Sequence, residues 1–243
     1  MRTIILLFTG MLLLGSCNPK HTQQSSVIIE NIDAKKFNEL IEEEKGIVLD
    51  VRTPEEVSEG HIKNASTINF LGSDFIEKIN MMQKEVPIYV YCRSGNRSSK
   101  AAELLKENGF SKVYNLKGGI FEWENKGYPL VKPDTTQDEK IQQLTLAEFK
   151  ELLKTDQPVL VDFHTTWCSP CRQMAPIVDR IEELHKDKAV VLRVDIDKSK
   201  ELGKSYKING VPVFIIFKNG KEIWKHNGII AEAELKKQID DNL

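Results

Sequence analysis

Residues 86–109 read VPIYVYCRSGNRSSKAAELLKENG, and residues 158–171 read PVLVDFHTTWCSPC. Each segment begins with a short apolar run typical of a buried strand and then reaches a cysteine. In the first, Ser98 to Asn108 has helical spacing, and Gly109 is a natural helix C-cap. In the second, the cysteines open a helix. Both segments therefore predict a reactive thiol at the carboxyl end of a strand and the start of a helix.

Outward from the first segment, apolar strands alternate with helical patterns. Residues 46–51 and 112–116 read as further strands beside 86–91. Alternation of this kind is typical of an α/β domain with a parallel sheet covered by helices.

The second half repeats the alternation. Thr145 and Glu148 form a capping box that opens a helix ending near Lys154. Residues 158–163 and 190–194 read as central strands, and Asn219-Gly220 predicts a hairpin between 213–218 and 221–226. Residues 231–242 predict a closing amphipathic helix. We therefore expect an α/β fold in two domains, each with its own core.

The composition agrees with two soluble units. The chain has 243 residues, of which 40% are apolar and 29% charged, with a net charge of −2. Without a long basic run, a nucleic-acid partner is not expected. Residues 131–140 read VKPDTTQDEK, the composition of a linker. We divide the chain into a signal (1–17), a tether (18–26), a first domain (27–132), a linker (133–140) and a second domain (141–243).

The N-terminal segment predicts export. Met1-Arg2 precedes an apolar run over residues 4–14 that is shorter than the roughly 20 residues needed to span a bilayer. Leu14-Gly15-Ser16-Cys17 resembles the signal of bacterial lipoproteins, which implies cleavage before Cys17 and lipidation of Cys17. The expected location is extracytoplasmic, in a periplasm or at the cell surface, with membrane contact through this lipid only. The alternative is plain secretion with Cys17 incidental.

Cys92 begins a loop suited to an anion. Backbone N–H groups of Ser94, Gly95 and Asn96 precede a helix N-terminus, and Gly95 can adopt the positive φ that curls such a loop. Arg93 and Arg97 add positive charge. A thiol placed there should have a lowered pKa and act as a nucleophile toward an anion.

These residues resemble the rhodanese family. The match rests on Asp50 to Glu56 (DVRTPEE), Gly60-His61-Ile62, Cys92 to Arg97, and Leu116 to Gly119 with Trp123. The resemblance implies a persulfide carried on Cys92. The six-residue loop has the size that sulfurtransferases use; the related phosphatases and arsenate reductases have one residue more. Asp50 and Arg52 are candidates for a pair that supports the loop, and a rhodanese fold used only for docking is the alternative.

Cys168 and Cys171 form a dithiol motif at a helix start. Two intervening residues let the sulfurs close a disulfide. We expect the Cys168 sulfur to be exposed and its thiolate to be favoured by the helix N-terminus, with Cys171 as the resolving thiol. A second pair of ligands at zinc spacing is missing from the sequence, so no metal is expected.

The second half resembles thioredoxin. The resemblance implies a mixed sheet with helices on both faces. It assigns Asp162 as the buried acid that moves protons, Trp167 as a neighbour of the dithiol, and Pro212 as the cis-proline that binds substrate backbone. Ser169, His164 and Arg193 depart from the common pattern. His164 either shifts the pKa of Cys168 or is a harmless surface replacement.

The leading functional hypothesis joins the two halves without a cofactor. Cys92 takes sulfur from thiosulfate, a polysulfide or a protein persulfide, and the Cys168/Cys171 dithiol accepts it, releases sulfide and is reduced again by an external reductant. The alternative is an extracytoplasmic thiol–disulfide oxidoreductase in which the first domain binds partners or senses sulfur. An interaction protein with vestigial sites is a third possibility, and a phosphatase or arsenate reductase is a fourth that the loop length disfavours.

Overall fold

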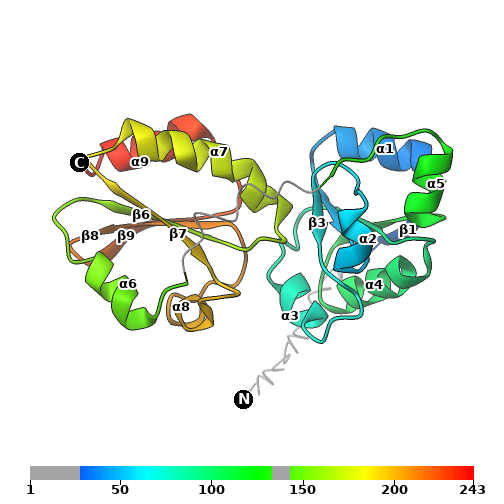
Figure 1. Cartoon of the computed structure of the whole chain (residues 1–243), viewed down its shortest axis with the longest axis horizontal. Helices are drawn as coiled ribbons and strands as arrows, with labels where there is room; N and C mark the ends of the chain where they lie inside the picture. The colour runs from blue at the N-terminus through cyan, green and yellow to red at the C-terminus, as the bar shows by residue number, and fades with distance from the viewer. Residues whose placement is uncertain (1–27, 133–142) are drawn as a thin grey trace, which may run out of the picture.

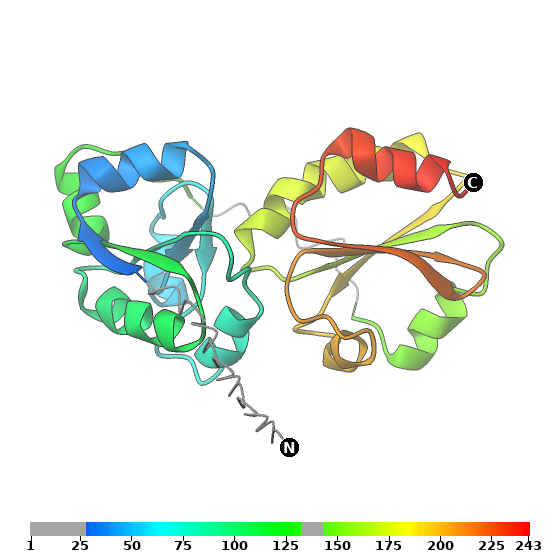
Figure 2. The same cartoon turned by 180° about the vertical axis from the view of Figure 1, so that it is seen from behind.

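The computed structural model describes residues 28–132 and 143–243, which form two α/β units (Figures 1 and 2). The predicted signal, the tether, residue Cys17 and the predicted linker over 133–140 lie outside the described residues. Within the described part, no helix is long and apolar enough to cross a bilayer.

The first unit has a parallel sheet in the order β1-β5-β4-β2-β3. Helices α1 and α5 cover one face, and α3 and α4 cover the other (Figure 1). Its elements are β1 (Ile28–Ile32), α1 (Ala34–Glu42), β2 (Ile47–Asp50), α2 (Pro54–Ser58), β3 (Ala65–Thr67), α3 (Phe75–Asn80), β4 (Ile88–Tyr91), α4 (Asn96–Glu107), β5 (Lys112–Leu116) and α5 (Gly119–Asn125).

The second unit has a mixed sheet in the order β7-β6-β8-β9, with β6 and β7 parallel and the other pairs antiparallel. Helices α7 and α9 lie on one face, and α6 and α8 lie on the other (Figure 1). Its elements are α6 (Leu146–Leu152), β6 (Val159–His164), α7 (Ser169–Leu184), β7 (Val190–Asp195), α8 (Lys200–Ser205), β8 (Val213–Lys218), β9 (Lys221–Asn227) and α9 (Glu232–Asp240). The expectation of two α/β units, one parallel and one mixed, is confirmed.

Local signals in the sequence explain where several elements begin and end. Thr145 and Glu148 form the complete capping box at the start of α6. Asn219 and Gly220 both have positive φ, as the tight hairpin between β8 and β9 requires. Helix α4 begins at Asn96, two residues before the predicted start, because Gly95 at φ 99° turns the chain straight from the loop into the helix.

The two units share part of their core, contrary to the expectation of two separate cores. One continuous cluster of buried apolar residues includes Phe75, Ile79 and Met82 of the first unit and Trp167 and Val211 of the second. Two other clusters stay within one unit each, beneath α1 and α5 and beneath α7 and α9. Beside this cluster, the N-terminal end of α7 packs against the edge strand β3 (Figures 1 and 2).

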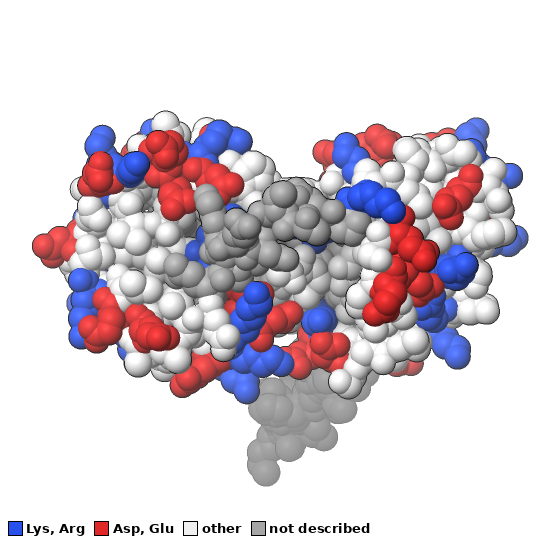
Figure 3. All heavy atoms as spheres, viewed as in Figure 1, with Lys and Arg blue, Asp and Glu red and all other residues white. Residues whose placement is uncertain are grey.

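Charged side chains are interspersed on the visible surface. In Figure 3, Lys and Arg alternate with Asp and Glu over both units of the face shown. This mixture contrasts with the single-sign basic stripe typical of nucleic-acid-binding surfaces.

Candidate functional site

Cys92 follows directly after β4 and lies inside the loop that leads into α4. The Gly95 backbone N–H donates to its Sγ at 3.1 Å, and the Ser98 hydroxyl does so at 3.4 Å. Cys92 is a free thiol and is only 1% exposed. The loop therefore curls around the sulfur, as the positive φ of Gly95 allows.

The surroundings of Cys92 favour its thiolate. Burial opposes ionisation, but hydrogen bonds from the Ser98 side chain and from the backbone N–H groups of Ser98, Ser94 and Gly95 outweigh it. The pKa of Cys92 consequently lies below its usual value. Ser98 was not among the residues singled out from the sequence, although its place in the first turn after the loop could have pointed to it.

The two loop arginines have different surroundings. The Arg97 guanidinium forms a bidentate ion pair with Glu56, with both N–O distances 2.7 Å, and this pair lowers the pKa of Glu56 to about 2. The pKa of Arg97 is raised, mainly by the hydrogen bond to Glu56 and to a smaller extent by the Cys92 sulfur, which Arg97 also faces. Arg93 is exposed, as are Ser94 and Asn96.

Asp50 and Arg52 form a buried ion pair at 2.7 Å beside the loop. Arg52 also donates to the carbonyl oxygens of Glu56 and Gly60 and lies over the Tyr91 ring. The Asp50–Arg52 pair holds α2 through the Glu56 carbonyl. Because the Glu56 side chain in turn binds Arg97, this buried pair helps to position Arg97 at Cys92.

The start of α5 supports the Cys92 loop from the other side. The backbone N–H of Ile120 donates to the Cys92 carbonyl, and that of Phe121 donates to the Arg93 carbonyl. A Cβ on Gly119 would lie 2.4 Å from the Cys92 carbonyl oxygen. Gly119 is therefore the residue that permits this close approach, a role that the sequence pattern did not specify.

Cys168 and Cys171 are joined in a disulfide, with an S–S distance of 2.09 Å. Cys168 is the N-cap of α7, and its sulfur accepts the Cys171 N–H at 3.1 Å. The expectation that the Cys168 sulfur is exposed is wrong: Cys168 is 2% exposed, because the first unit packs over this end of the helix. Trp167 donates its indole N–H to Asp197 at 2.8 Å.

Asp162 is a buried residue of β6, an interior strand of the second unit's sheet. Burial raises its pKa, and His164 and Arg193 partly offset that effect. The His164 Nδ1 and the Arg193 Nε lie 3.7 and 3.6 Å from Asp162 Oδ2, and within the described part of the chain neither carboxylate oxygen has a hydrogen-bond partner. His164 is itself buried, so its interpretation as a surface replacement is wrong.

The Val211–Pro212 peptide bond is cis. The Val211 N–H is directed away from its own domain and donates to the Met81 carbonyl oxygen of the first unit at 3.0 Å. Pro212 thus lies where the first unit meets the second.

The two thiol sites lie on different sides of strand β2. Cys92 follows β4, whereas the dithiol contacts β3, and β2 separates these two strands. Thr67, Asp50 and Tyr91 share one register level, so the sites are separated by at least two strand spacings of about 5 Å each. Across the described residues, no cluster of His, Cys, Asp or Glu is arranged to hold a metal ion.

Comparisons with known proteins match each half separately. Residues 33–126 match the family model described as Rhodanese-like domain, and residues 140–241 match the model described as Thioredoxin. A thioredoxin of Alicyclobacillus acidocaldarius is 37% identical over 100 residues, which cover 41% of this chain and 95% of the relative.

Two further matches concern the same half. Thioredoxin Y, chloroplastic, of Oryza sativa subsp. japonica is 42% identical over 100 residues, which cover 41% of this chain. The chain spans 60% of the length of that relative. A solved thioredoxin structure of Plasmodium falciparum has 30% identity and a TM-score of 0.39, and the match covers 42% of this chain and 97% of that one.

Proposed function

We propose that the rhodanese-like domain (residues 33–126) of this chain, which belongs to the thioredoxin family through residues 140–241, is a sulfurtransferase. Its sulfur acceptor is the dithiol of the thioredoxin domain. The coarser activity, thiol–disulfide redox chemistry at Cys168 and Cys171, follows from the family and from the disulfide. The observation that carries the finer proposal is a free thiol of lowered pKa in the same chain as this dithiol.

The first step is sulfur capture by Cys92. The Cys92 thiolate attacks the outer sulfur of thiosulfate, the S–S bond of thiosulfate breaks, and sulfite leaves with the bonding electron pair. The product is a persulfide on Cys92. Arg93, Arg97 and the loop N–H groups supply the positive field that an anionic donor and an anionic persulfide need. A polysulfide or a protein persulfide is an equally balanced donor.

The second step passes the sulfur to the dithiol. The Cys168 thiolate attacks the outer persulfide sulfur, which moves to Cys168 and frees Cys92. The Cys171 thiolate then attacks the Cys168 sulfur, hydrosulfide leaves, and the disulfide forms. The dithiol is oxidised by two electrons and the transferred sulfur is reduced. An external dithiol or electron carrier must then restore Cys168 and Cys171.

This relay requires a change in the arrangement of the domains. Cys92 and the disulfide lie on different sides of β2, so the thioredoxin domain has to leave β3 before Cys168 meets the persulfide, either in the same chain or in a second copy. Joining the domains in one chain raises their effective concentration for this encounter.

We also propose that the lipid on Cys17 holds the mature protein at an extracytoplasmic membrane face. The support is the sequence alone, Leu14-Gly15-Ser16-Cys17 after a short apolar run. Metabolic labelling with a fatty acid tests it: label is expected on the wild type and not on Cys17→Ala. An unlabelled, fully released wild type would contradict it.

The relay is tested on residues 18–243, which keep both domains and remove Cys17. The reduced protein is mixed with thiosulfate, and intact mass and sulfide release are recorded. We expect one added sulfur on Cys92, none in Cys92→Ser, and loss of sulfide release in Cys168→Ser. A Cys92→Ser protein that turned thiosulfate over at the wild-type rate would refute the proposal.

The second candidate is a thiol–disulfide oxidoreductase in which the rhodanese-like domain is a binding module. The observation that favours it is the packing of this domain over the dithiol. It differs from the relay in one expected result. Reduction of a protein disulfide would be the main activity, and its rate would be the same in Cys92→Ser as in the wild type.

A further inference from the structure

The rhodanese-like domain approaches the dithiol through the edge of its sheet. In β3, the backbone N–H of Thr67 points away from the sheet and donates to the Trp167 carbonyl at 3.1 Å. The Ser66 hydroxyl accepts the N–H of Ser169, the residue after Cys168, at 2.9 Å. The Arg172 guanidinium donates to the Ala65 carbonyl. The open edge of one domain is thus covered by the active-site turn of the other.

The same domain also occupies the opposite side of the dithiol. The turn after α3 presents the Met81 carbonyl to the Val211 N–H, next to cis-Pro212. Gln83 lies against Gly228, close enough that a Cβ there would meet its side-chain amide at 2.5 Å. A polypeptide that bound the dithiol domain by strand-like pairing would need this same Val211 N–H.

The contacts on both sides leave the disulfide without access for a protein. Cys168 and Cys171 are 2% and 3% exposed. The shared apolar cluster continues from Met82 through the disulfide to Val211. Attack on a disulfide requires a thiolate in line with the S–S bond, so a folded partner has no approach while the domains are packed.

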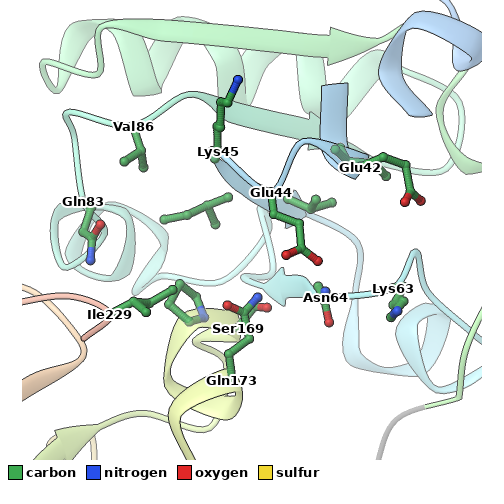
Figure 4. Close-up of a pocket in the computed structure, with 15 residues that line it drawn as sticks. Glu42, Glu44, Lys45, Lys63, Asn64, Gln83, Val86, Ser169, Gln173 and Ile229 are labelled. Carbon is green, nitrogen blue, oxygen red and sulfur yellow. The ribbon is translucent and has the colours of Figure 1, made fainter. Parts of the chain in front are cut away.

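A pocket at the interface between the two domains does not give a protein access to the disulfide. A pocket of about 150 Å³ lies between the domains, lined by Ser169, Pro170 and Gln173 on one side and by Glu44, Asn64 and Gln83 among others on the opposite side (Figure 4). It borders the two residues between the cysteines, but neither cysteine lines it. Its size suits a small molecule and not a polypeptide.

We infer that the protein-binding face of the dithiol has the chain's own rhodanese-like domain as its resident partner, and that this docked arrangement excludes folded protein partners until the domains separate. The inference deepens the proposed function and rests on its dithiol, but it makes no use of Cys92. Backbone pairing at Thr67 and Val211 replaces the pairing that an external polypeptide would make. Separation of the domains is then the step that any protein reductant of the disulfide has to wait for.

The test compares two reductants of different size on oxidised residues 18–243 carrying Cys92→Ser. One is a small phosphine, and the other is a reduced thioredoxin, whose dithiol gives two electrons and two protons to Cys168–Cys171 and becomes a disulfide itself. Ser66→Glu places a longer, charged side chain against Ser169 and should separate the domains. Ser111→Glu is the matched control, because Ser111 is exposed and bonds to Lys84 in its own domain.

We expect Ser66→Glu to accelerate reduction by thioredoxin at least tenfold and reduction by the phosphine less than threefold. Amide exchange at Thr67 and Val211 should accelerate in parallel, with the Ser111→Glu protein unchanged. Fast thioredoxin reduction of the parent Cys92→Ser protein, with unprotected Thr67 and Val211 amides, would overturn the inference. So would an opened interface in Ser66→Glu with no gain in the thioredoxin rate.

Two safeguards keep the test decisive. Met81→Glu perturbs the other side of the dithiol, so a folding defect of Ser66→Glu does not remove the comparison. The ratio of the thioredoxin rate to the phosphine rate in the parent Cys92→Ser protein is informative by itself. Because all proteins carry Cys92→Ser, the result does not depend on whether Cys92 transfers sulfur.

Discussion

Cys92 owes its character to short-range donors more than to the arginines beside it. The Ser98 hydroxyl and three backbone N–H groups lower its pKa against the opposing effect of burial. Arg97 is shared between this sulfur and Glu56. The donors are fixed by the loop and by the first turn of α4, so the thiolate is stabilised before any substrate arrives.

We predict that Ser98→Ala raises the pKa of Cys92, because it removes the side-chain hydrogen bond that favours the thiolate. At pH 7 less thiolate would be present, and alkylation by iodoacetamide should be about three- to tenfold slower. In oxidised residues 18–243, Cys92 is the reactive thiol, so the pH profile of alkylation measures it directly. Ser99→Ala is the matched control, since the Ser98 and Ser99 hydroxyls both bond to the Gly95 carbonyl, whereas the bond to the Cys92 sulfur comes from Ser98. Coincident profiles for both variants would contradict the prediction.

We predict that Asp162→Asn stabilises the oxidised protein at pH 7. Burial raises the Asp162 pKa, so folding disfavours the charged carboxylate, and this penalty grows as pH rises above the ordinary aspartate value of about 3.9. The gain should be about 1–3 kcal/mol at pH 7 and vanish below that ordinary value.

Urea unfolding at pH 3.5 and pH 7 measures this gain. Asp156→Asn, at an exposed carboxylate, is the control and should change little at either pH. An Asp162→Asn protein that is less stable than wild type at pH 7 would count against the argument.

At the scale of elements, three helix starts and one sheet edge build the sites. Helix α4 supplies the Ser98 hydroxyl to Cys92, α5 holds the Cys92 and Arg93 carbonyls, and α7 carries Cys168 as its cap. Strand β3 has only three residues, yet its outward edge contacts the turn around Cys168. A short edge strand here receives a partner from the same chain, which also protects it from pairing with other molecules.

We predict that Gly119→Ala disrupts the Cys92 loop. Gly119 has φ 62°, and its Cβ would lie 2.6 Å or less from the Cys92 and Arg93 backbone. Persulfide formation from thiosulfate should fall by about tenfold or more. Gly109→Ala is the control, because φ is 89° there but nothing lies within 4 Å, so it should cost ~1 kcal/mol of stability and leave the rate nearly unchanged. Equal rates for the two variants would show that α5 does not hold the loop.

At the scale of the whole molecule, the shared cluster makes the two domains one packed body around the disulfide. The polar contacts between the two domains include both buried hydrogen bonds and an exposed ion pair. Arg172 is mostly buried and bonds a backbone carbonyl, whereas Lys200 and Glu77 form an exposed ion pair at 3.3 Å. Buried contacts of this type hold an interface more firmly than exposed ion pairs.

We predict that Arg172→Met loosens the domains and Lys200→Gln does not. The amide of Thr67 reports docking, because its partner is the Trp167 carbonyl of the other domain. Its exchange should accelerate at least about tenfold in Arg172→Met, since a buried carbonyl loses its donor. In Lys200→Gln the change should stay below about fivefold, the equivalent of ~1 kcal/mol for an exposed pair. The reverse order would mean that charge, and not the buried contacts, holds the seam.

Much of the fold was predictable because its signals are local. The strands at 112–116 and 213–218 have the bounds that their apolar runs predict, and the Asn219-Gly220 turn and the Thr145/Glu148 capping box lie where the sequence indicates. Strand β3 and helix α3 are among the elements that were missed, since a three-residue strand has no measurable alternation and a six-residue helix little periodicity.

The cysteine loops were predictable for the same reason: Cys92 with Gly95, and Cys168 with Cys171, are neighbours along the chain, and the backbone between them fixes their geometry. The sequence by itself therefore determined two α/β units and the local geometry of each cysteine loop. Only the tertiary structure decided that the disulfide is buried, because that burial depends on Ser66, Thr67 and Met81, which lie about 100–130 residues from their partners at Ser169, Trp167 and Val211. Contacts over such separations come from packing between domains, which leaves no periodic or local signal in the chain.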